Sequence, residues 1–110
     1  MEDGIDVRGV RWGHPDTATP VALYPGVAKQ TLWEGEGGRK ALLLTIDPGC
    51  RFLELDVHEP GPEEVYVVRG TFQDGVRDYP EGTFIQYPRG SAHIPQSFTG
   101  CTLLVIFPEG

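Results

Sequence analysis

Short runs of hydrophobic residues, each bounded by glycine or proline, dominate the sequence. Runs of this length that are rich in β-branched and aromatic residues and separated by turn residues predict β-strands. Five strands are expected, at KALLLTI (40–46), RFLELDVH (51–58), EEVYVVRG (63–70), TFIQYP (83–88) and CTLLVIFP (101–108). VRGVRW (7–12) and VAKQTLW (27–33) are weaker candidates. No longer window shows the 3.6-residue periodicity of an amphipathic helix.

The regular spacing of these strands predicts an all-β fold, either an antiparallel sandwich or a small barrel. A closed barrel leaves few exposed strand edges, and a barrel of about eight strands can hold a small ligand. The segment from His14 to Gly26 contains three prolines and is expected to pack as a loop across the body.

The run RFLELDVH can be oriented in two ways, because side chains alternate between the two faces of a strand. One face carries Leu53, Leu55 and Val57, and the other carries Phe52, Glu54, Asp56 and His58. Considered alone, the run favours leucines in the core and acidic side chains in water. The opposite orientation places polar groups inside the barrel, where they need hydrogen-bond partners or a ligand.

Composition describes a soluble globular protein, with 39% hydrophobic and 23% charged residues in 110 positions. We expect one domain over residues 1–110, in which residues 1–11 form an N-terminal extension or arm. A formal net charge of −7 argues against binding to nucleic acid or to an anionic membrane surface.

The chain contains no apolar run long enough to span a bilayer, and its start, MEDGIDVRG, lacks the features of a signal peptide. We therefore expect a cytoplasmic protein. The two cysteines, Cys50 and Cys101, show no CxxC spacing and are expected to be buried free thiols.

A motif near the C-terminus changes how RFLELDVH is interpreted. In GTFIQYPRGSAHIPQS (82–97), the residues Gly82, Pro88, Gly90 and His93 have the spacing of the second sequence motif of the cupin superfamily. Glu63 and Gly70 match the end of the first cupin motif, and His58 lies four intervening residues before Glu63. The first histidine of that motif falls on Asp56, which is the one departure.

Most of the chain, roughly Trp12 to Phe107, resembles the ChrR-like cupins. This group is named for an anti-sigma factor with a C-terminal cupin domain, and it includes stand-alone cupins similar to dioxygenases that act on aromatic ketones. The resemblance implies an antiparallel double-stranded β-helix (jelly-roll barrel) with a divalent metal inside. It also implies a homodimer, because cupins commonly pair through edge strands.

Carried over by position, the resemblance implies the metal ligands Asp56, His58, Glu63 and His93. Two imidazoles and one carboxylate suit Fe²⁺ or Zn²⁺, and a second carboxylate makes the site harder, which favours Mn²⁺, Fe²⁺ or Zn²⁺ over softer ions. Three roles for Asp56 stay open. It ligates the metal, it orients a ligating histidine, or it marks a cupin that has lost its metal.

We expect a metal-dependent enzyme, dioxygenase-like, that acts on a small organic molecule inside the barrel. The alternatives are a non-catalytic cupin that senses a metal or ligand, similar to the ChrR cupin domain, and a metal-free structural barrel. Phe52, Glu54 and Gln86 are the candidate substrate-binding residues. Arg51 and Arg69, like Gln86, would anchor an anionic substrate if they pointed inward.

Overall fold

Thirteen short elements, almost all of them β-strands, form the body of the protein. A computed structural model describes residues 3–110, and it contains no α-helix within that range. The elements are β1 (Val21–Tyr24), β2 (Val27–Glu34), the 3₁₀ turn η1 (Glu36–Gly38), β3 (Lys40–Ile46), β4 (Cys50–Arg51), β5 (Asp56–Val57), β6 (Glu63–Gly70), β7 (Phe72–Gln73), β8 (Asp78–Tyr79), β9 (Phe84–Tyr87), β10 (Ala92–His93), β11 (Gln96–Ser97) and β12 (Cys101–Phe107). None of the described helical turns could cross a membrane.

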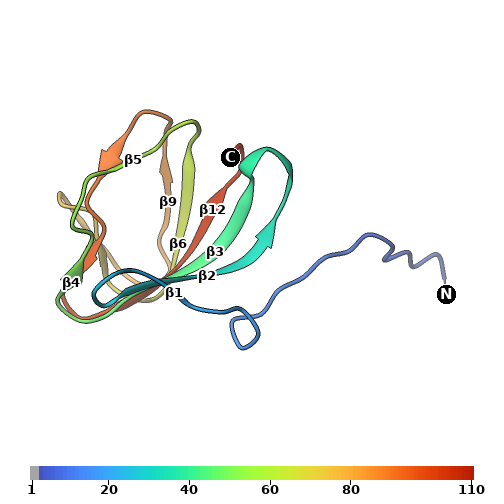
Figure 1. The fold of residues 1–110 in the computed structure, drawn as a ribbon, viewed down its shortest axis with the longest axis horizontal. Coiled ribbons are helices and arrows are strands. Elements are labelled where there is room, and N and C mark those ends of the chain that lie inside the picture. The colour runs from blue at the N-terminus through green and yellow to red at the C-terminus, as the bar shows by residue number, and fades with distance from the viewer. Residues whose placement is uncertain (1–2) are drawn as a thin grey trace.

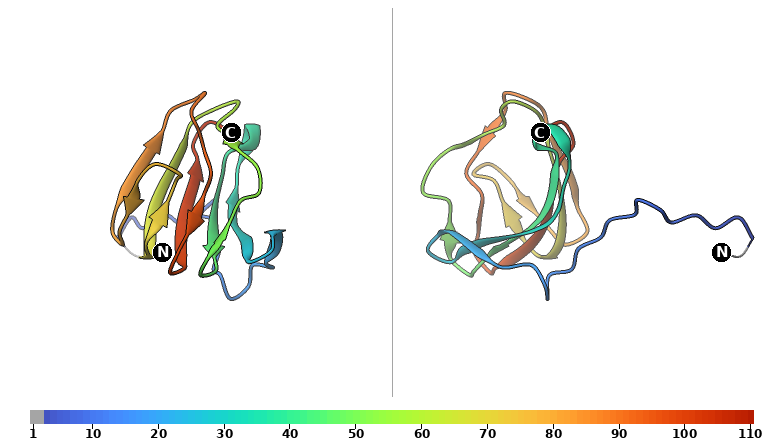
Figure 2. Two further views of the ribbon diagram at one scale, coloured as in Figure 1. Left: turned by 90° about the vertical axis from the view of Figure 1, so that its left-hand side faces the viewer. Right: turned by 45° about the vertical axis from the view of Figure 1, so that its right-hand side comes forward.

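One large sheet and two small ones make up the barrel. The large sheet has the strand order β1-β2-β3-β12-β6-β9, and the smaller sheets have the orders β4-β11-β7-β8 and β10-β5. Every strand pair is antiparallel. The large sheet curves, and the segments that carry β4 and β5 lie across from it, so that the sheets enclose an interior (Figures 1 and 2). This arrangement confirms the expected antiparallel all-β barrel.

The hydrophobic core lies on the inner face of the large sheet. Leu42, Leu44 and Ile46 alternate along β3 and are buried, and the register pairs Leu44 with Leu103 and Leu42 with Val105 on β12. Each such aliphatic side chain contributes roughly 1.5–3 kcal/mol when it is fully removed from water. Alternation on the two central strands therefore fixes which face of the sheet points into the barrel.

The predicted strands at 40–46 and 63–70 are confirmed residue for residue, as β3 and β6. Three further predictions agree to within one residue at either end: 27–33 as β2, 83–88 as β9 and 101–108 as β12. The prediction at 7–12 is wrong, because these residues form no strand. The loop predicted across 14–26 contains strand β1, which pairs with the edge of β2.

The run RFLELDVH does not form one strand. A bend at Leu53 and Glu54 separates β4 from β5, and the two short strands pair with different partners, β11 and β10. The leucines of this run are exposed, whereas His58 is buried. The orientation with Asp56 and His58 toward the interior is therefore the observed one, and the orientation that the run favours by itself is wrong.

The N-terminal segment extends away from the barrel (Figure 1). The predicted extension covers residues 1–11, of which residues 1 and 2 lie outside the described range. Residues 3–14 are exposed, and Trp12 is 83% exposed. The segment meets the body at β2, where the guanidinium of Arg11 lies 5.7 Å from the centroid of the Trp33 ring.

Candidate metal centre

The pairing of β5 with β10 brings two of the candidate ligands together. Asp56 and His93 are direct partners in this antiparallel pair, as are Val57 and Ala92. Residues opposite each other on paired strands project to the same face, so both side chains point into the barrel. His93 Nε2 lies 3.2 Å from Asp56 Oδ2. Two segments 37 residues apart in sequence therefore supply one histidine–carboxylate pair.

His58 and Glu63 form a second histidine–carboxylate pair. The backbone of His58 continues the β5–β10 contact, donating from its N–H to the carbonyl of Ser91 (2.9 Å) and accepting from the N–H of Gly90 (2.8 Å). Glu63 is the first residue of β6. His58 Nδ1 lies 3.0 Å from Glu63 Oε2, and both side chains are buried.

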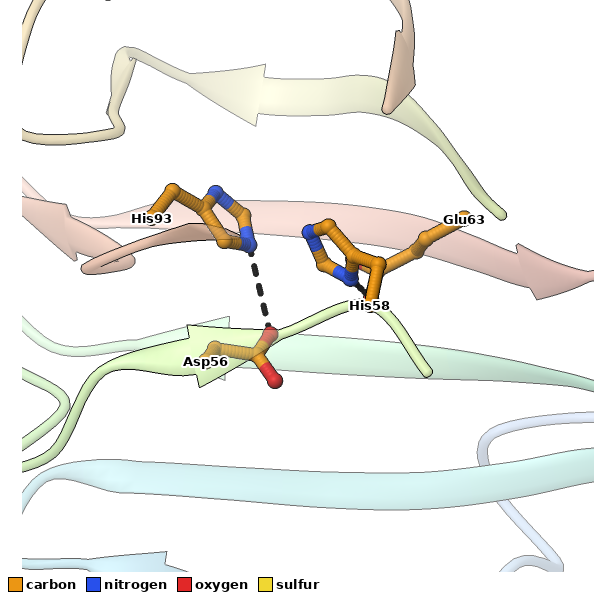
Figure 3. Close-up of side chains that lie close together, drawn as sticks. All are labelled: Asp56, His58, Glu63 and His93. Carbon is orange, nitrogen blue, oxygen red and sulfur yellow. Dashed lines mark hydrogen bonds and ion pairs between the residues drawn. The ribbon is translucent and has the colours of Figure 1, made fainter. Parts of the chain in front are cut away.

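The four side chains make one cluster (Figure 3). One candidate ligand atom of each residue, Asp56, His58, Glu63 and His93, lies within 4.8 Å of the others. The imidazole centroids are 4.6 Å apart. All four residues predicted from the cupin motifs are thus in one place, and Asp56 is the most exposed of them, with 32% of its side chain accessible.

The chemistry of this donor set suits a divalent cation. An ionised carboxylate only accepts hydrogen bonds, so a neutral His58 carries its proton on Nδ1, toward Glu63, and has a lone pair on Nε2. His58 Nε2 is buried and has no hydrogen-bond partner among residues 3–110, and the same holds for His93 Nδ1. An unsatisfied buried polar atom costs about 1–3 kcal/mol. A metal ion coordinated by an imidazole nitrogen removes such a penalty.

The charges around His58 favour its protonated form. Burial alone would lower the pKa of His58, but the hydrogen bond and charge of Glu63, helped by the charge of Asp56, outweigh burial and raise the pKa above its usual value of 6.5. Two carboxylates close to one imidazole attract a positive charge, whether a proton or a metal ion.

A buried tyrosine that no sequence motif marks supports the cluster. The ring of Tyr87 lies 4.3 Å from His93 and 5.1 Å from His58, measured between centroids. Its hydroxyl donates to the buried carboxylate of Asp74 (3.0 Å), which also accepts from the hydroxyl of Tyr79 (2.8 Å). Burial and the neighbouring Asp74 raise the pKa of Tyr87 well above its usual range.

The cluster opens onto a pocket of about 170 Å³. Phe52, a predicted substrate-binding residue, lines this pocket together with Asp56, Glu63 and His93. Glu54 lies at the bend after β4 and is exposed, and it does not line the pocket.

The other polar residues considered for substrate binding also point elsewhere. Gln86 is exposed between the buried residues Ile85 and Tyr87 on β9, so its side chain is on the outer face of the large sheet. Arg51 and Arg69 are exposed and do not line the pocket. The anchors for an anionic substrate that the sequence suggested are therefore outside the site.

Asp56 is within the cluster, and both roles that involve a metal fit its position. Its carboxylate is close enough to the other donors to share a cation with them. It also contacts the imidazole of His93, as a carboxylate that orients a ligating histidine does.

Solved structures with this fold include several cupins. The chain is similar to the anti-sigma factor ChrR of Rhodobacter sphaeroides, solved in complex with SigE (24% identity, TM-score 0.72, covering 84% of this chain and 50% of that one). It is also similar to an RmlC-like cupin of Shewanella frigidimarina (21% identity, TM-score 0.78, 90% of each chain). A third similar structure is the polyketide cyclase RemF of Streptomyces resistomycificus (20% identity, TM-score 0.72, 88% of this chain and 78% of that one). These likenesses show the fold, and this chain spans half the length of the ChrR chain that it matches.

No curated protein matches the sequence. A sequence family, the ChrR Cupin-like domain, matches residues 10–108. That range contains every strand of the barrel and all four residues of the cluster. The protein therefore belongs to the family of ChrR cupin-like domains.

Proposed function

We propose that this protein is a metal-dependent, dioxygenase-like enzyme that acts on a small organic molecule inside the barrel. The observation that carries the proposal is that a cluster of two histidines and two carboxylates opens directly onto a largely apolar pocket. A small concave site with a few convergent polar groups is the usual form of an enzyme site. A cluster that served structure alone would gain nothing from access to such a pocket.

His58, His93 and Glu63 would hold Fe²⁺, Mn²⁺ or Zn²⁺, with Asp56 as the fourth ligand or as the group that orients His93. A metal bound there supplies Lewis-acid or redox chemistry to the substrate. Phe52 and the other aromatic side chains of the pocket exclude water.

Oxygen uptake tests the enzymatic part of this proposal. Protein loaded in turn with Fe²⁺, Mn²⁺ and Zn²⁺ would be offered a panel of diketones and aromatic ketones, with His93→Ala as the inactive reference. Consumption of oxygen by the wild type and its loss in His93→Ala support a dioxygenase. Metal binding without turnover of any member of the panel contradicts it.

A non-catalytic sensor of a metal or ligand is the second candidate, favoured by the family match and by the likeness to the anti-sigma factor ChrR. A sensor would show no turnover, and metal binding would change the exposure of its N-terminal segment. Limited proteolysis near Trp12, with and without metal, measures that exposure. An unchanged cleavage pattern would count against it.

We further propose that the chain acts as a single cupin domain in the cytoplasm and as a homodimer. The outer face of the large sheet supports a dimer, because Leu43, Leu104, Tyr66 and Phe84 are successive cross-strand neighbours there. Tyr66 is 43% exposed and Phe84 60% exposed. Sedimentation of the wild type and of Phe84→Glu tests the proposal, since a dimer that uses this face should dissociate in the variant.

A further inference from the structure

The pocket beside the metal cluster carries positive charge at only two positions. Among residues 3–110, the only lysine or arginine side chains that line the pocket are those of Lys29 and Lys40. They are also the only two lysines in the chain, whereas its seven arginines all lie elsewhere. The protein has a formal net charge of −7, yet both of its lysines lie at this one pocket.

Strand alternation places both lysines on the inner face of the barrel. Lys40 has the same parity along β3 as the buried residues Leu42 and Leu44, and Lys29 is the cross-strand partner of Leu44. Both lysines are partly buried. They also line an adjoining surface hollow, so they lie at the rim of the pocket, between its interior and the solvent.

Neither ammonium group has an acidic partner in the part of the chain that the structure describes. Within residues 3–110, no carboxylate oxygen lies within 4.0 Å of either lysine, although Glu34 lines the adjoining hollow. Lys40 Nζ instead lies 5.0 Å from the centroid of the Phe107 ring, which also lines the pocket. A partly buried charge gains stability from a counter-ion, and the described residues supply none in contact.

Lys40 lies at the same level of the barrel as the metal cluster. The register pairs Lys40 with Phe107 on β12, and continuing the pairing of β12 with β6 by one residue beyond Ile106 and Glu64 puts Glu63 on the other side of Phe107. Two strand spacings separate the backbones of Lys40 and Glu63 by roughly 10 Å. A small molecule lying along this row would touch the lysine at one end and the metal cluster at the other.

The charge of the metal cluster explains why the lysines are needed. A divalent ion held by three histidines and one glutamate has a net charge of +1 and attracts an anion by itself. In this protein Asp56 stands at the position of the first histidine, so the two carboxylates of Asp56 and Glu63 would cancel the charge of a bound divalent ion. An anionic ligand must then find its positive partner elsewhere in the pocket.

We propose that the pocket binds a small organic acid. Lys29 and Lys40 hold its carboxylate at the rim, and the apolar part lies against Phe52 and Phe107, directed toward the metal cluster. The inference rests on the proposed function for the part played by the metal, and it adds the class of substrate. It also corrects the earlier hypothesis that Arg51, Arg69 or Gln86 anchors an anion.

Binding of phenylacetate and of its neutral analogue phenylacetamide tests the proposal. The two probes have nearly the same size and shape, but one ends in a carboxylate and the other in a neutral carboxamide. Both are titrated by calorimetry into metal-free and Zn²⁺-loaded protein. The wild type should bind the acid more tightly than the amide. Lys29→Met/Lys40→Met should weaken binding of the acid roughly tenfold or more, as expected on loss of a charged hydrogen bond, and should leave binding of the amide unchanged. The matched control Arg69→Gln/Arg77→Gln, which removes two exposed charges, should keep the preference, and so should Lys29→Arg/Lys40→Arg.

The presence of only two lysines allows a direct second readout. Reductive methylation with ¹³C-formaldehyde keeps the charge and labels the two lysines and the N-terminal amine, and the two single variants assign the lysine NMR signals. Phenylacetate should shift these signals and phenylacetamide should not. Equal binding of the two probes, no binding of either, unmoved lysine signals, or a preference that survives in the double methionine variant would each overturn the proposal.

The two proposals fail in different ways. If none of Fe²⁺, Mn²⁺ and Zn²⁺ binds, the metal-dependent function is wrong, while the preference for the acid is still measured in the metal-free protein. If Zn²⁺ binds and the double methionine variant still prefers the acid, the metal holds the carboxylate and the lysines do not. In that case the metal site stands and the inference about the lysines is wrong.

Discussion

Asp56 and His93 lie directly opposite each other on β5 and β10, and His93 Nε2 is 3.2 Å from Asp56 Oδ2. The pairing depends on the break in the run 51–58, because only after the bend at Leu53 and Glu54 does the chain turn Asp56 toward β10. An aspartate thus occupies the place where the cupin motif has its first histidine. The consequences of this exchange can be measured.

Removing the charge of Asp56 should weaken metal binding. Asp56→Asn keeps the size of the side chain but loses a negative oxygen donor next to His93, so we expect the affinity for Mn²⁺ or Zn²⁺ to fall roughly 10- to 100-fold. Competition with a chromophoric chelator measures the affinity. Glu54→Gln, which removes the same charge two residues away at an exposed position, should bind as the wild type does. Equal metal affinities in the wild type and both variants would show that Asp56 does not contribute to metal binding.

The stabilising effect of the metal should grow with pH. The pKa of His58 is raised in the folded protein. Its contribution to the stability of the metal-free protein is therefore present below the unfolded value of about 6.5 and is lost as pH rises through the folded pKa. Metal binding needs the deprotonated imidazole and follows the opposite trend. Melting curves from about pH 6 to about pH 8, with and without Zn²⁺, should show a widening difference in Tm, which a constant difference would contradict.

The buried carboxylate of Asp74 should be needed for stability. It accepts hydrogen bonds from the hydroxyls of Tyr79 and Tyr87 and from the backbone N–H groups of Val76 and Arg77. Asp74→Ala leaves these donors without their acceptor, and we expect the free energy of unfolding to fall by at least about 1–3 kcal/mol. Urea denaturation measures the change.

Asp78→Ala, the same change at an exposed position of β8, is the matched control for Asp74→Ala and should change stability little. Acid should have an effect of its own. Burial alone would raise the pKa of Asp74, but its four hydrogen bonds lower it below the usual value of 3.8. Its contribution is therefore present above about pH 3.8 and is lost as pH falls through the folded pKa. A variant Asp74→Ala as stable as the wild type at neutral pH would contradict this role.

The two cysteines should differ in reactivity. Both are free thiols, as expected from the sequence, but the expectation that both are buried is correct only for Cys101. Burial raises the pKa of the Cys101 thiol to about 11, which leaves little of the reactive thiolate at neutral pH. Cys50 is only partly buried. Iodoacetamide should modify Cys50 in the native protein and Cys101 only after unfolding, as read by mass spectrometry of the peptides. Rapid native modification of Cys101 would show that β12 opens more readily than its packing implies.

The sequence predicted the central strands and the four residues of the cluster for different reasons. β3 and β6 were found because alternation and turn residues are local signals. The cluster was found because Gly82, Pro88, Gly90 and His93 fix a motif, not because any local pattern places His93 near Asp56. The bend at Leu53 and Glu54 could not be predicted, since the alternation of the run continues through it.

Two features of the site are not evident from the sequence in the same way. The bonds from Tyr79 and Tyr87 to Asp74 join separate strands, and no local pattern indicates such a meeting. The inward orientation of Lys40 could have been predicted, because Lys40 continues the alternation that puts the leucines of KALLLTI on the inner face. A charged residue at an inward position of a predicted barrel strand is a signal for ligand binding.

The metal content of the protein tests the central claim most directly. Wild-type protein purified without chelator, together with Asp56→Ala, His58→Ala and His93→Ala, would be assayed for bound metal and for the change in Tm on adding Mn²⁺, Fe²⁺ or Zn²⁺. We predict about one divalent ion per wild-type chain, a rise in Tm with added metal, and loss of both in the histidine variants. A wild-type protein without near-stoichiometric metal, whose Tm no divalent ion changes, would contradict the account.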